Sequence, residues 1–357
     1  MKSAAITAAV LGALLANGAW GFDEVVRRNV SFESGGVTLV GHLYLPDGHD
    51  ARRLPGLVVT GAWTTVKEQM PATCAAVMAG RGFAVLTFDF RGWGDSEGHP
   101  RFLEDPERKT EDIIAATTYL AARPEVDAAR IGGLGVCASA GYMSDAAHRS
   151  PVVRAIGLSA PWLHNDAIAE SVYGGPEGVA NLVAAGREAA ASDEPVIIEA
   201  ASTTNEAALV FNVPYYTEAD RGLVETYDNR FNVASWEPWL AYDAISIGDS
   251  LRKPTLVVHS RAAVIPEGVT EFAARMGGHA RIMWLDGITQ FDFYDQPAPI
   301  AMAADALAEH FTTVFELQQD VAAVKTVVEG VASSRTWDSS MPSKISMRTR
   351  SSSTTAR

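Results

Sequence analysis

Short apolar segments rich in β-branched residues recur along the chain, and segments with helical periodicity lie between most of them. The apolar segments cover residues 25–32, 37–44, 57–60, 83–88, 131–136, 155–158, 255–259 and 281–285. The periodic segments cover residues 66–79, 110–122, 139–148, 269–276 and 298–317. Strands that alternate with helices of about ten to fifteen residues predict an α/β fold. We therefore expect a mostly parallel central sheet with helices on both faces.

The alternation breaks between residues 161 and 250, where aromatic, glycine and proline residues separate helical pieces. Because this segment lies between two predicted core strands, we expect an inserted helical cap over the carboxyl edge of the sheet. Ligands bind at that edge, and a cap adds the apolar walls that the edge lacks. The candidate substrate-binding residues are Trp162, Tyr215, Tyr216, Trp236 and Trp239. The alternative is that these aromatic residues only pack the cap onto the core.

The two ends of the chain differ in composition from the rest. Residues 1–18 place one lysine before an apolar run too short to span a bilayer, which predicts a signal peptide and a secreted or periplasmic protein. An alanine-rich helix or a misplaced start codon, in a cytoplasmic protein, is the alternative. Residues 333–357 are rich in Ser, Thr and Arg, and we expect a disordered tail there. The core is then expected over residues 24–160 and 251–317, on either side of the cap.

The charge and the residue composition of the chain exclude several classes of function. The net charge of -14 argues against nucleic acid as a partner, because phosphate binding needs a positive surface. No later segment has the length of a transmembrane helix, so we expect no membrane partner. Two cysteines, Cys74 and Cys137, are too few for a disulfide framework in a fold of this size. Neither metal-ligand spacing nor a phosphate-binding loop occurs in the sequence, so we expect no metal and no other cofactor.

A candidate nucleophile lies where an apolar segment meets a helical one. The sequence Gly-Val-Cys-Ala-Ser places small residues, Gly135 and Ser139, two positions on either side of Cys137. A nucleophile at a tight strand-to-helix turn needs small neighbours there, and the helix N-terminus favours a thiolate. Ser139, within Cys-Ala-Ser-Ala-Gly, is the rival nucleophile. An inert buried Cys137 is the non-catalytic alternative.

Backbone amides near this turn are candidates for stabilising an oxyanion. Ala138 directly follows the predicted nucleophile. The segment Gly-Ala-Trp-Thr follows another buried strand and offers a second amide, from either Ala62 or Trp63. The sequence does not separate these two residues.

Four motifs in this order resemble α/β hydrolases related to dienelactone hydrolase, and also the fungal polyketide transferases of that superfamily. They are Gly-Ala-Trp-Thr-Thr-Val-Lys-Glu-Gln from residue 61, Asp-Phe-Arg-Gly-Trp-Gly-Asp-Ser from 89, Gly-Val-Cys-Ala-Ser-Ala-Gly-Tyr from 135 and Phe-Asp-Phe-Tyr-Asp from 291. The resemblance runs from about residue 26 to 315 and implies the α/β-hydrolase fold. It also implies that an acid after the seventh core strand and a histidine after the eighth complete the nucleophile.

The chain departs from that pattern at both supporting positions. The loop after residues 255–259 reads Ser-Arg-Ala-Ala-Val-Ile-Pro and contains no carboxylate. The loop after residues 281–285 has Gln290 where the resemblance implies histidine. A glutamine amide cannot act as a general base near neutral pH, so ordinary Cys-His-Asp hydrolysis is in question.

Three residues are candidate substitutes for the missing base. His164 follows the sixth core strand at the carboxyl edge, and its alternative is a polar surface residue. His259 closes the seventh strand, where a structural hydrogen bond is the alternative. Asp292 lies two residues beyond Gln290 and would orient a water or pair with a cation, unless it only anchors its loop.

These features predict an enzyme that transfers an acyl group through Cys137, acting on a small ester, lactone or thioester. A thiolate needs less help from a base than a serine hydroxyl does. Two alternatives stay open. One is a non-catalytic homologue that holds an apolar ligand, and the other is a polyketide-type acyltransferase that uses an alcohol or amine acceptor faster than water. The expected partner is a small-molecule substrate, and the chain is compatible with a homodimer.

Overall fold

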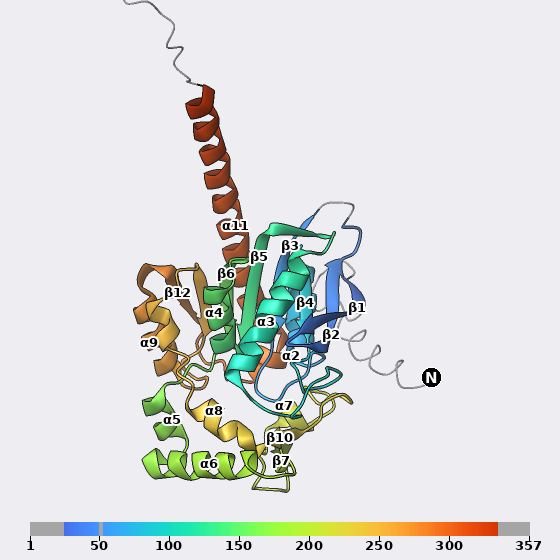
Figure 1. Ribbon diagram of the computed structural model, residues 1–357, viewed down its shortest axis with the longest axis vertical. Coiled ribbons are helices and arrows are strands. Elements are labelled where there is room, and N and C mark those ends of the chain that lie inside the picture. The colour runs from blue at the N-terminus through green and yellow to red at the C-terminus, as the bar shows by residue number, and fades with distance from the viewer. Residues whose placement is uncertain (1–24, 50–52, 335–357) are drawn as a thin grey trace, which may run out of the picture. The chain divides into compact units, whose positions relative to one another are not determined.

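A computed structural model describes residues 25–49 and 53–334. Its core is an eight-stranded sheet of order β1-β2-β4-β3-β5-β6-β11-β12 (Figure 1). The strands are β1 (Val25–Ser34), β2 (Val37–Pro46), β3 (Leu54–Thr60), β4 (Ala84–Phe88), β5 (Val126–Val136), β6 (Val153–Ser159), β11 (Thr255–His259) and β12 (Ala280–Trp284). β2 runs antiparallel to β1 and β4, and every pair from β4 to β12 is parallel. The predicted, mostly parallel sheet is confirmed.

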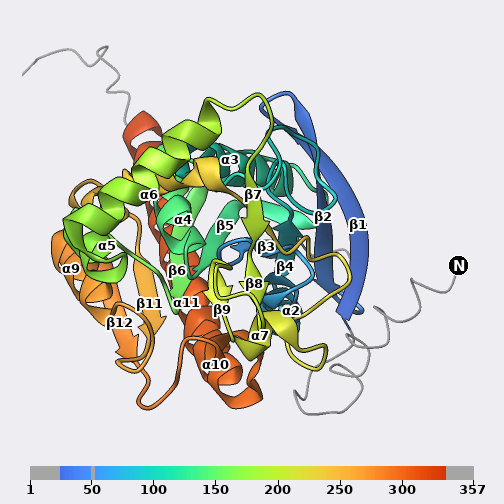
Figure 2. The same ribbon diagram turned by 90° about the horizontal axis from the view of Figure 1, so that it is seen from below.

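Helices cover both faces of this sheet (Figure 2). α3 (Pro106–Ala121) and α4 (Ser139–Arg149) lie on one face, and α2 (Met70–Ala79) and the first part of α11 (Pro297–Ser334) lie on the other. Glycines on β5 allow this close packing. A Cβ atom on Gly132 would lie 2.6 Å from Phe311 of α11, and one on Gly133 would lie 2.1 Å from Met143 of α4. α9 (Pro266–Met276), followed by the single turn η3 (Gly277–His279), packs beside β12.

The inserted cap lies between β6 and β11, which are parallel neighbours in the sheet. Its helices are α5 (Asp166–Val172), α6 (Gly175–Ala190), α7 (Pro214–Thr217) and α8 (Trp236–Leu240), with the short turns η1 (Val233–Ser235) and η2 (Ser246–Asp249). The sequence predicted only helices here, but the cap also contains two small sheets. β7 (Ile197–Glu199) pairs with β10 (Arg230–Asn232), and β8 (Ala201–Ser202) pairs with β9 (Val210–Phe211).

Several predicted boundaries differ from the structure by a few residues, and two of these differences have a clear physical reason. α2 begins at Met70 instead of residue 66, because residues 66–69 form a turn in which the Gln69 amide donates to the Val66 carbonyl. Pro71 in the first turn of the helix suits this later start. α11 continues to Ser334, so the expected tail is wrong for its first two residues, because an established helix extends at little cost. The rest of that tail and the expected signal peptide lie outside the described residues.

Contacts divide the chain near the end of the core. Residues as far as Phe315 belong to one compact unit, and α11 from Glu316 onward belongs to a second. All elements named above, other than this last part of α11, lie in the first unit. In the described part of the chain no helix combines the length and apolar character needed to cross a membrane.

Candidate active site

Cys137 occupies a tight turn between β5 and α4. Its φ angle is +56°, in the left-handed region that most residues avoid. The turn brings Gly135 against the start of α4, where an added Cβ atom would lie 2.7 Å from the Ala140 Cα atom. The Cys137 amide donates to the Ser159 carbonyl at 3.2 Å, and the Cys137 carbonyl accepts from the Trp162 amide at 2.9 Å. The backbone therefore holds this strained turn from both sides.

Ser139, the rival nucleophile, closes the turn from the inside. Its hydroxyl accepts from the Val136 amide at 3.2 Å and from Thr60 Oγ1 at 2.9 Å, and it donates to the Val136 carbonyl at 3.0 Å. The residue is fully buried and does not line the cavity described next. The geometry thus places Cys137, and not Ser139, at the tip of the turn. The chemical role of Cys137 stays a prediction.

Cys137 and Ala138 line a cavity of about 590 Å³ between the core and the cap. Four of the five predicted aromatic residues line it, namely Trp162, Tyr216, Trp236 and Trp239. Tyr215 does not. It is buried behind the wall, with its ring edge-on to Tyr294 at a centroid distance of 5.2 Å. The other lining residues are mostly apolar: Trp63, Val172, Tyr173, Leu182, Ile198, Ala207, Ala208, Leu209, Val210, Val264, Gln290, Phe291 and Tyr294. Among these described residues no side chain carries a formal charge.

Hydrogen-bond donors surround the Cys137 sulfur. Burial raises the pKa of the thiol, and hydrogen bonding to Tyr294, to the backbone amides of Ala138 and Trp63 and to Gln290 acts in the opposite direction. Of the two candidate residues, Trp63 is therefore the one whose amide lies beside the sulfur, and its role as an oxyanion donor stays a prediction. Two convergent amides are the arrangement that stabilises an oxyanion or a thiolate.

Gln290 and Tyr294 form the wall beside the sulfur. Gln290 Nε2 donates to the Ala160 carbonyl at 2.8 Å and to the Tyr294 hydroxyl at 2.9 Å, and Gln290 Oε1 accepts from the Val264 amide at 3.4 Å. These bonds fix an amide in the place where the resemblance implies an imidazole. Sequence reasoning missed Tyr294. Its spacing of four from Gln290, which puts two side chains on one face of a helical turn, was the available signal.

His164 does not line the cavity, contrary to the expectation that it could reach Cys137. Its Nδ1 accepts from Trp162 Nε1 at 3.2 Å, and its Nε2 lies 3.0 Å from the Trp239 carbonyl oxygen. Burial lowers its pKa. Both ring nitrogens are engaged, so the imidazole holds two aromatic residues of the cavity wall in place. The surface-residue alternative is also wrong, because His164 is only 1% exposed.

His259 and Asp292 also lie outside the cavity lining. His259 is fully buried, with Nε2 3.1 Å from the Val264 carbonyl oxygen, and burial lowers its pKa to about 4. Asp292 accepts from the Thr289 amide at 2.8 Å and from Thr289 Oγ1 at 2.6 Å. It therefore anchors its own loop. Neither residue is placed to take a proton from the Cys137 thiol.

A buried ion cluster supports the loop that carries Trp63, and sequence reasoning missed it. Lys67 Nζ lies 2.7 Å from carboxylate oxygens of both Asp89 and Asp95 and 2.8 Å from one of Glu68. The Lys67 amide also donates to Asp89 at 2.7 Å. Burial lowers the pKa of Lys67, but the adjacent carboxylates outweigh it and raise that pKa overall. The cluster joins the first two of the four sequence motifs.

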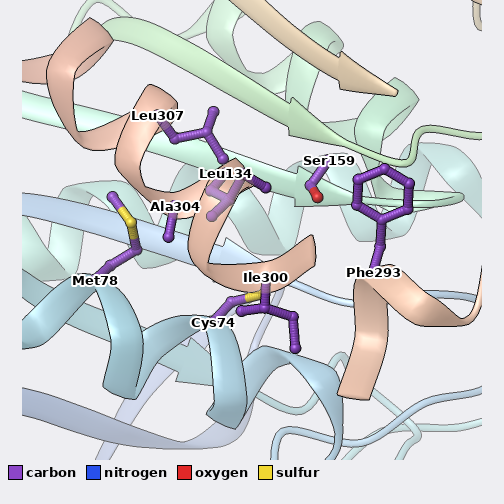
Figure 3. A pocket seen from close by; sticks show the side chains of 9 residues that line it. Cys74, Met78, Leu134, Ser159, Phe293, Ile300, Ala304 and Leu307 are labelled. Atoms are coloured by element: carbon purple, nitrogen blue, oxygen red, sulfur yellow. The ribbon is translucent and has the colours of Figure 1, made fainter. Parts of the chain in front are cut away.

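Cys74 occupies a different environment from Cys137. It lines a second cavity of only about 10 Å³, where its sulfur lies beside Ile300 (Figure 3). Burial raises the pKa of the Cys74 thiol to about 12, so it is inert at neutral pH. Both cysteines are free. Within residues 25–49 and 53–334 no group of three or more His, Cys, Asp or Glu side chains is arranged to hold a metal ion.

A known protein family matches most of the chain. A family model described as X-Pro dipeptidyl-peptidase (S15 family) matches residues 35–262, which is more than half of the chain. The match includes Trp63 and Cys137 and ends before Gln290.

Individual proteins resemble shorter parts of the chain. The protein PA2218 of Pseudomonas aeruginosa is 39% identical over 134 residues, which is 37% of this chain and 36% of PA2218. The polyketide transferase claH of Penicillium crustosum is 34% identical over 106 residues, 29% of this chain and 34% of claH. The thiohydrolase aneE of Aspergillus aculeatus is 39% identical over 104 residues, 29% of this chain and 31% of aneE. The chain thus matches less than half the length of these curated relatives.

A solved structure extends the likeness to most of the fold. The crystal structure of PA2218 superimposes with a TM-score of 0.69 and 25% identity, covering 80% of this chain and 94% of the other. Hydrolases and acyltransferases are found among the similar proteins. From the family match and the order of the strands, this chain belongs to the S15 family, whose model is described as X-Pro dipeptidyl-peptidase, and it has the α/β-hydrolase fold.

Proposed function

We propose that this protein is an acyl-transfer enzyme, a hydrolase or an acyltransferase, that forms a covalent intermediate on Cys137. The observation that carries the proposal is the position of the Cys137 sulfur. It lies at a strained turn, beside the amides of Trp63 and Ala138, and on the wall of an apolar cavity. Acyl transfer needs these three features together, because the nucleophile, the oxyanion donors and the substrate must meet at one carbonyl carbon.

The reaction has two steps. First, Cys137 Sγ bonds to the carbonyl carbon of an ester, lactone or thioester while the bond from that carbon to the leaving oxygen or sulfur breaks. The thiol proton leaves with the departing group. Then water or an acceptor alcohol, amine or thiol bonds to the same carbon, and the Cys137 thiol is released with a proton from that acceptor.

The cavity favours a neutral, apolar acyl group. A volume of about 590 Å³ lies within the usual range of small-molecule sites. Since none of the described lining residues is charged, nothing in the cavity would pair with a substrate ammonium or carboxylate. An ion buried without a partner is strongly disfavoured. This feature argues against the dipeptidyl-peptidase activity of the family's description, because a peptide's free amino terminus would need a carboxylate partner.

The names of two relatives support acyl chemistry for this chain. One is called a polyketide transferase and the other a thiohydrolase, and both names describe reactions at an activated carbonyl. Each matches about a third of its own length, so their substrates are proposals for this chain.

A second candidate function is ligand binding without turnover. The observation that favours it is Gln290, which lies where the resemblance implies a histidine and is held by the Ala160 carbonyl and Tyr294. A site without a general base would keep the shape of an enzyme and bind an apolar molecule in the same cavity.

Steady-state turnover separates the two functions. We expect the protein to turn over neutral acyl thioesters faster than matched substrates with a terminal carboxylate or ammonium on the acyl group, and Cys137→Ala to lose this turnover. Ser139→Ala is the matched variant, and it is expected to retain turnover if it folds. Retention of a neutral acyl ligand in calorimetry, with no turnover across the panel, would establish the binding function instead.

A further inference from the structure

Tyr294 is a polar side chain beside the Cys137 sulfur to which the two steps above give no role. It belongs to α10 (Asp292–Asp295) and lines the main cavity together with Cys137. Its oxygen accepts a hydrogen bond from Gln290 Nε2 at 2.9 Å. A phenolic hydroxyl has a single hydrogen, and since the Gln290 bond uses only the oxygen, this hydrogen can be donated to another group. The Tyr294 hydroxyl is hydrogen bonded with the Cys137 sulfur on the wall of the same cavity. Its hydrogen can therefore face a thiolate, or it can face a leaving group in the cavity while the S–H hydrogen of a neutral thiol faces the phenolic oxygen.

The surrounding residues fix the position of the Tyr294 ring. The side chain is 1% exposed, and its ring packs edge-on against Tyr215 at 5.2 Å and against Phe291 at 5.6 Å between centroids. Gln290, which orients the hydroxyl, is itself held by the Ala160 carbonyl at 2.8 Å. The hydroxyl therefore lies beside the sulfur without needing a substrate to order it.

The proposed acyl transfer requires a group that handles the thiol proton. As the bond from Sγ to the carbonyl carbon forms, the proton on sulfur must leave, and the departing oxygen or sulfur must gain one. Among the described residues that line the cavity there is no His, Asp, Glu, Lys or Arg. His164 and His259 lie outside this lining. Tyr294 is the ionisable side chain that contacts the sulfur itself.

We propose that Tyr294 is a catalytic residue that relays the thiol proton to the leaving group, and that Gln290 positions the Tyr294 hydroxyl. This proposal rests on the proposed acyl transfer at Cys137. The S–H bond breaks as Sγ bonds to the carbonyl carbon, and its proton passes to the phenolic oxygen. In the same step the phenolic proton passes to the leaving oxygen or sulfur as the bond from that atom to the carbonyl carbon breaks. The phenol is regenerated and never carries a full charge.

This relay suits thioesters better than oxygen esters. A departing thiolate has about the same basicity as the Cys137 thiolate, so the proton is only exchanged between two sulfur atoms. An alkoxide is much more basic than a thiolate, so the intermediate formed with an oxygen ester mostly expels Cys137 again. A phenol is a much weaker acid than the imidazolium that normally assists departure of an alkoxide.

The first test measures the ionisation of the thiol without any substrate. The rate of Cys137 alkylation by iodoacetamide is followed against pH by peptide mass mapping in the wild type, Tyr294→Phe and Tyr216→Phe. We expect the Tyr294→Phe profile to move up by about one pH unit, because a hydrogen bond to the thiolate is lost. Tyr216 lines the same cavity, and its Phe variant is expected to leave the profile in place.

The pH profile of alkylation reports the ionisation of Cys137 and not that of a neighbouring group. The titratable groups that face the thiol are tyrosines whose pKa burial raises, namely Tyr142, Tyr173, Tyr216 and Tyr294. Each of them therefore stays neutral over the range in which a thiol titrates. An unchanged profile in Tyr294→Phe overturns the proposal.

The second test measures acylation. Formation of the acyl-enzyme from the N-acetylcysteamine thioester of octanoate is timed at pH values where the wild type and Tyr294→Phe are alkylated equally fast. At matched thiolate content we expect Tyr294→Phe to be acylated at least about tenfold more slowly. Equal rates overturn the relay, because Tyr294 would then affect only the ionisation of the thiol.

These outcomes separate the relay from the function on which it rests. A wild type that no donor acylates ends the acyl-transfer proposal, whereas equal acylation of wild type and Tyr294→Phe ends only the relay. If Tyr294→Phe does not fold, a protein with 3-fluorotyrosine at position 294 is used in its place. Its more acidic hydroxyl is expected to move the labelling profile to lower pH, and an unmoved profile overturns the proposal.

Discussion

At residue 137 a cysteine sulfur, instead of a serine oxygen, changes how much help from a base the proposed nucleophile needs. A thiol ionises near pH 8.5 in water, whereas a serine hydroxyl needs a base to remove its proton. Gln290 cannot supply that base, and it is locked by bonds to the Ala160 carbonyl and Tyr294. The amides of Trp63 and Ala138 and the Tyr294 hydroxyl oppose the effect of burial on the thiol. These features favour the proposed cysteine nucleophile over a serine.

Cys137→Ser is expected to reduce turnover of thioesters by at least about 100-fold, which is the usual contribution of a general base that this site lacks. The variant exchanges one atom and keeps the turn, so folding is expected to be little changed. Steady-state kinetics together with a thermal melt measures both.

Adding Gln290→His to Cys137→Ser is the matched control. An imidazole at position 290 would lie where the resemblance implies one, so the double variant is expected to recover part of the lost turnover. A single Cys137→Ser variant as active as the wild type would mean that sulfur has no special role here.

Among the structural elements, two loops that are distant in sequence depend on one buried lysine. Lys67 joins the loop that follows β3, which carries Trp63, to Asp89 at the end of β4. Lys67 is 1% exposed and Asp89 is also 1% exposed. Charges this deeply buried depend on each other, because removing one leaves the other uncompensated.

Lys67→Met is expected to destabilise the protein by about 3 to 5 kcal/mol, the usual cost of breaking a buried ion pair from one side. Urea denaturation measures this free energy. In Lys67→Met/Asp89→Asn the most deeply buried of the three carboxylates is neutral as well, so we expect a smaller loss.

An exposed ion pair supplies the control for Lys67. Arg28 Nη1 lies 2.9 Å from Glu125 Oε1, and the Arg28 side chain is 49% exposed. Arg28→Met is expected to change stability by about 1 kcal/mol or less. Equal losses in Lys67→Met and Arg28→Met would contradict the structural role given to Lys67.

The sequence predicts elements better than the contacts between them. All eight core strands could be located from apolar runs, because each run is a local pattern. The short strands of the cap could not, since β7 to β10 contain only two or three residues each and pair with partners elsewhere in the cap. The cluster around Lys67 and the bond from Gln290 to Tyr294 depend on side-chain geometry that no single motif contains. His164 was misjudged for the same reason.

For the whole molecule, buried histidines make stability depend on pH, and the pKa is lowered furthest at His42 and His259. Burial lowers the pKa of His42 to about 3 and that of His259 to about 4. Both are neutral in the folded chain near pH 6, whereas in the unfolded chain each takes up a proton below about pH 6.5. The unfolded state is therefore favoured progressively as the pH falls from about 6.5 toward 4. Stability is greatest above this window and falls by up to about 3 kcal/mol per histidine within it.

His259→Gln is expected to lose less stability than the wild type between pH 7 and pH 4, because one of the histidines that take up a proton on unfolding is gone. Urea denaturation at several pH values gives the slope of the free energy of unfolding against pH. His279, exposed on the turn η3, provides the control variant His279→Gln. A His259→Gln slope equal to that of the wild type would show that His259 does not contribute to the pH dependence.

In the proposed reaction the acyl group becomes attached to Cys137. Intact-mass spectrometry after mixing with a neutral acyl thioester, followed by peptide mapping, tests it in the wild type, Cys137→Ala and Cys74→Ala. We predict one acyl group on the wild type and on Cys74→Ala, located at Cys137, and none on Cys137→Ala. An acyl group that persists on Cys137→Ala, or turnover with no adduct on Cys137 at any time, would contradict the account.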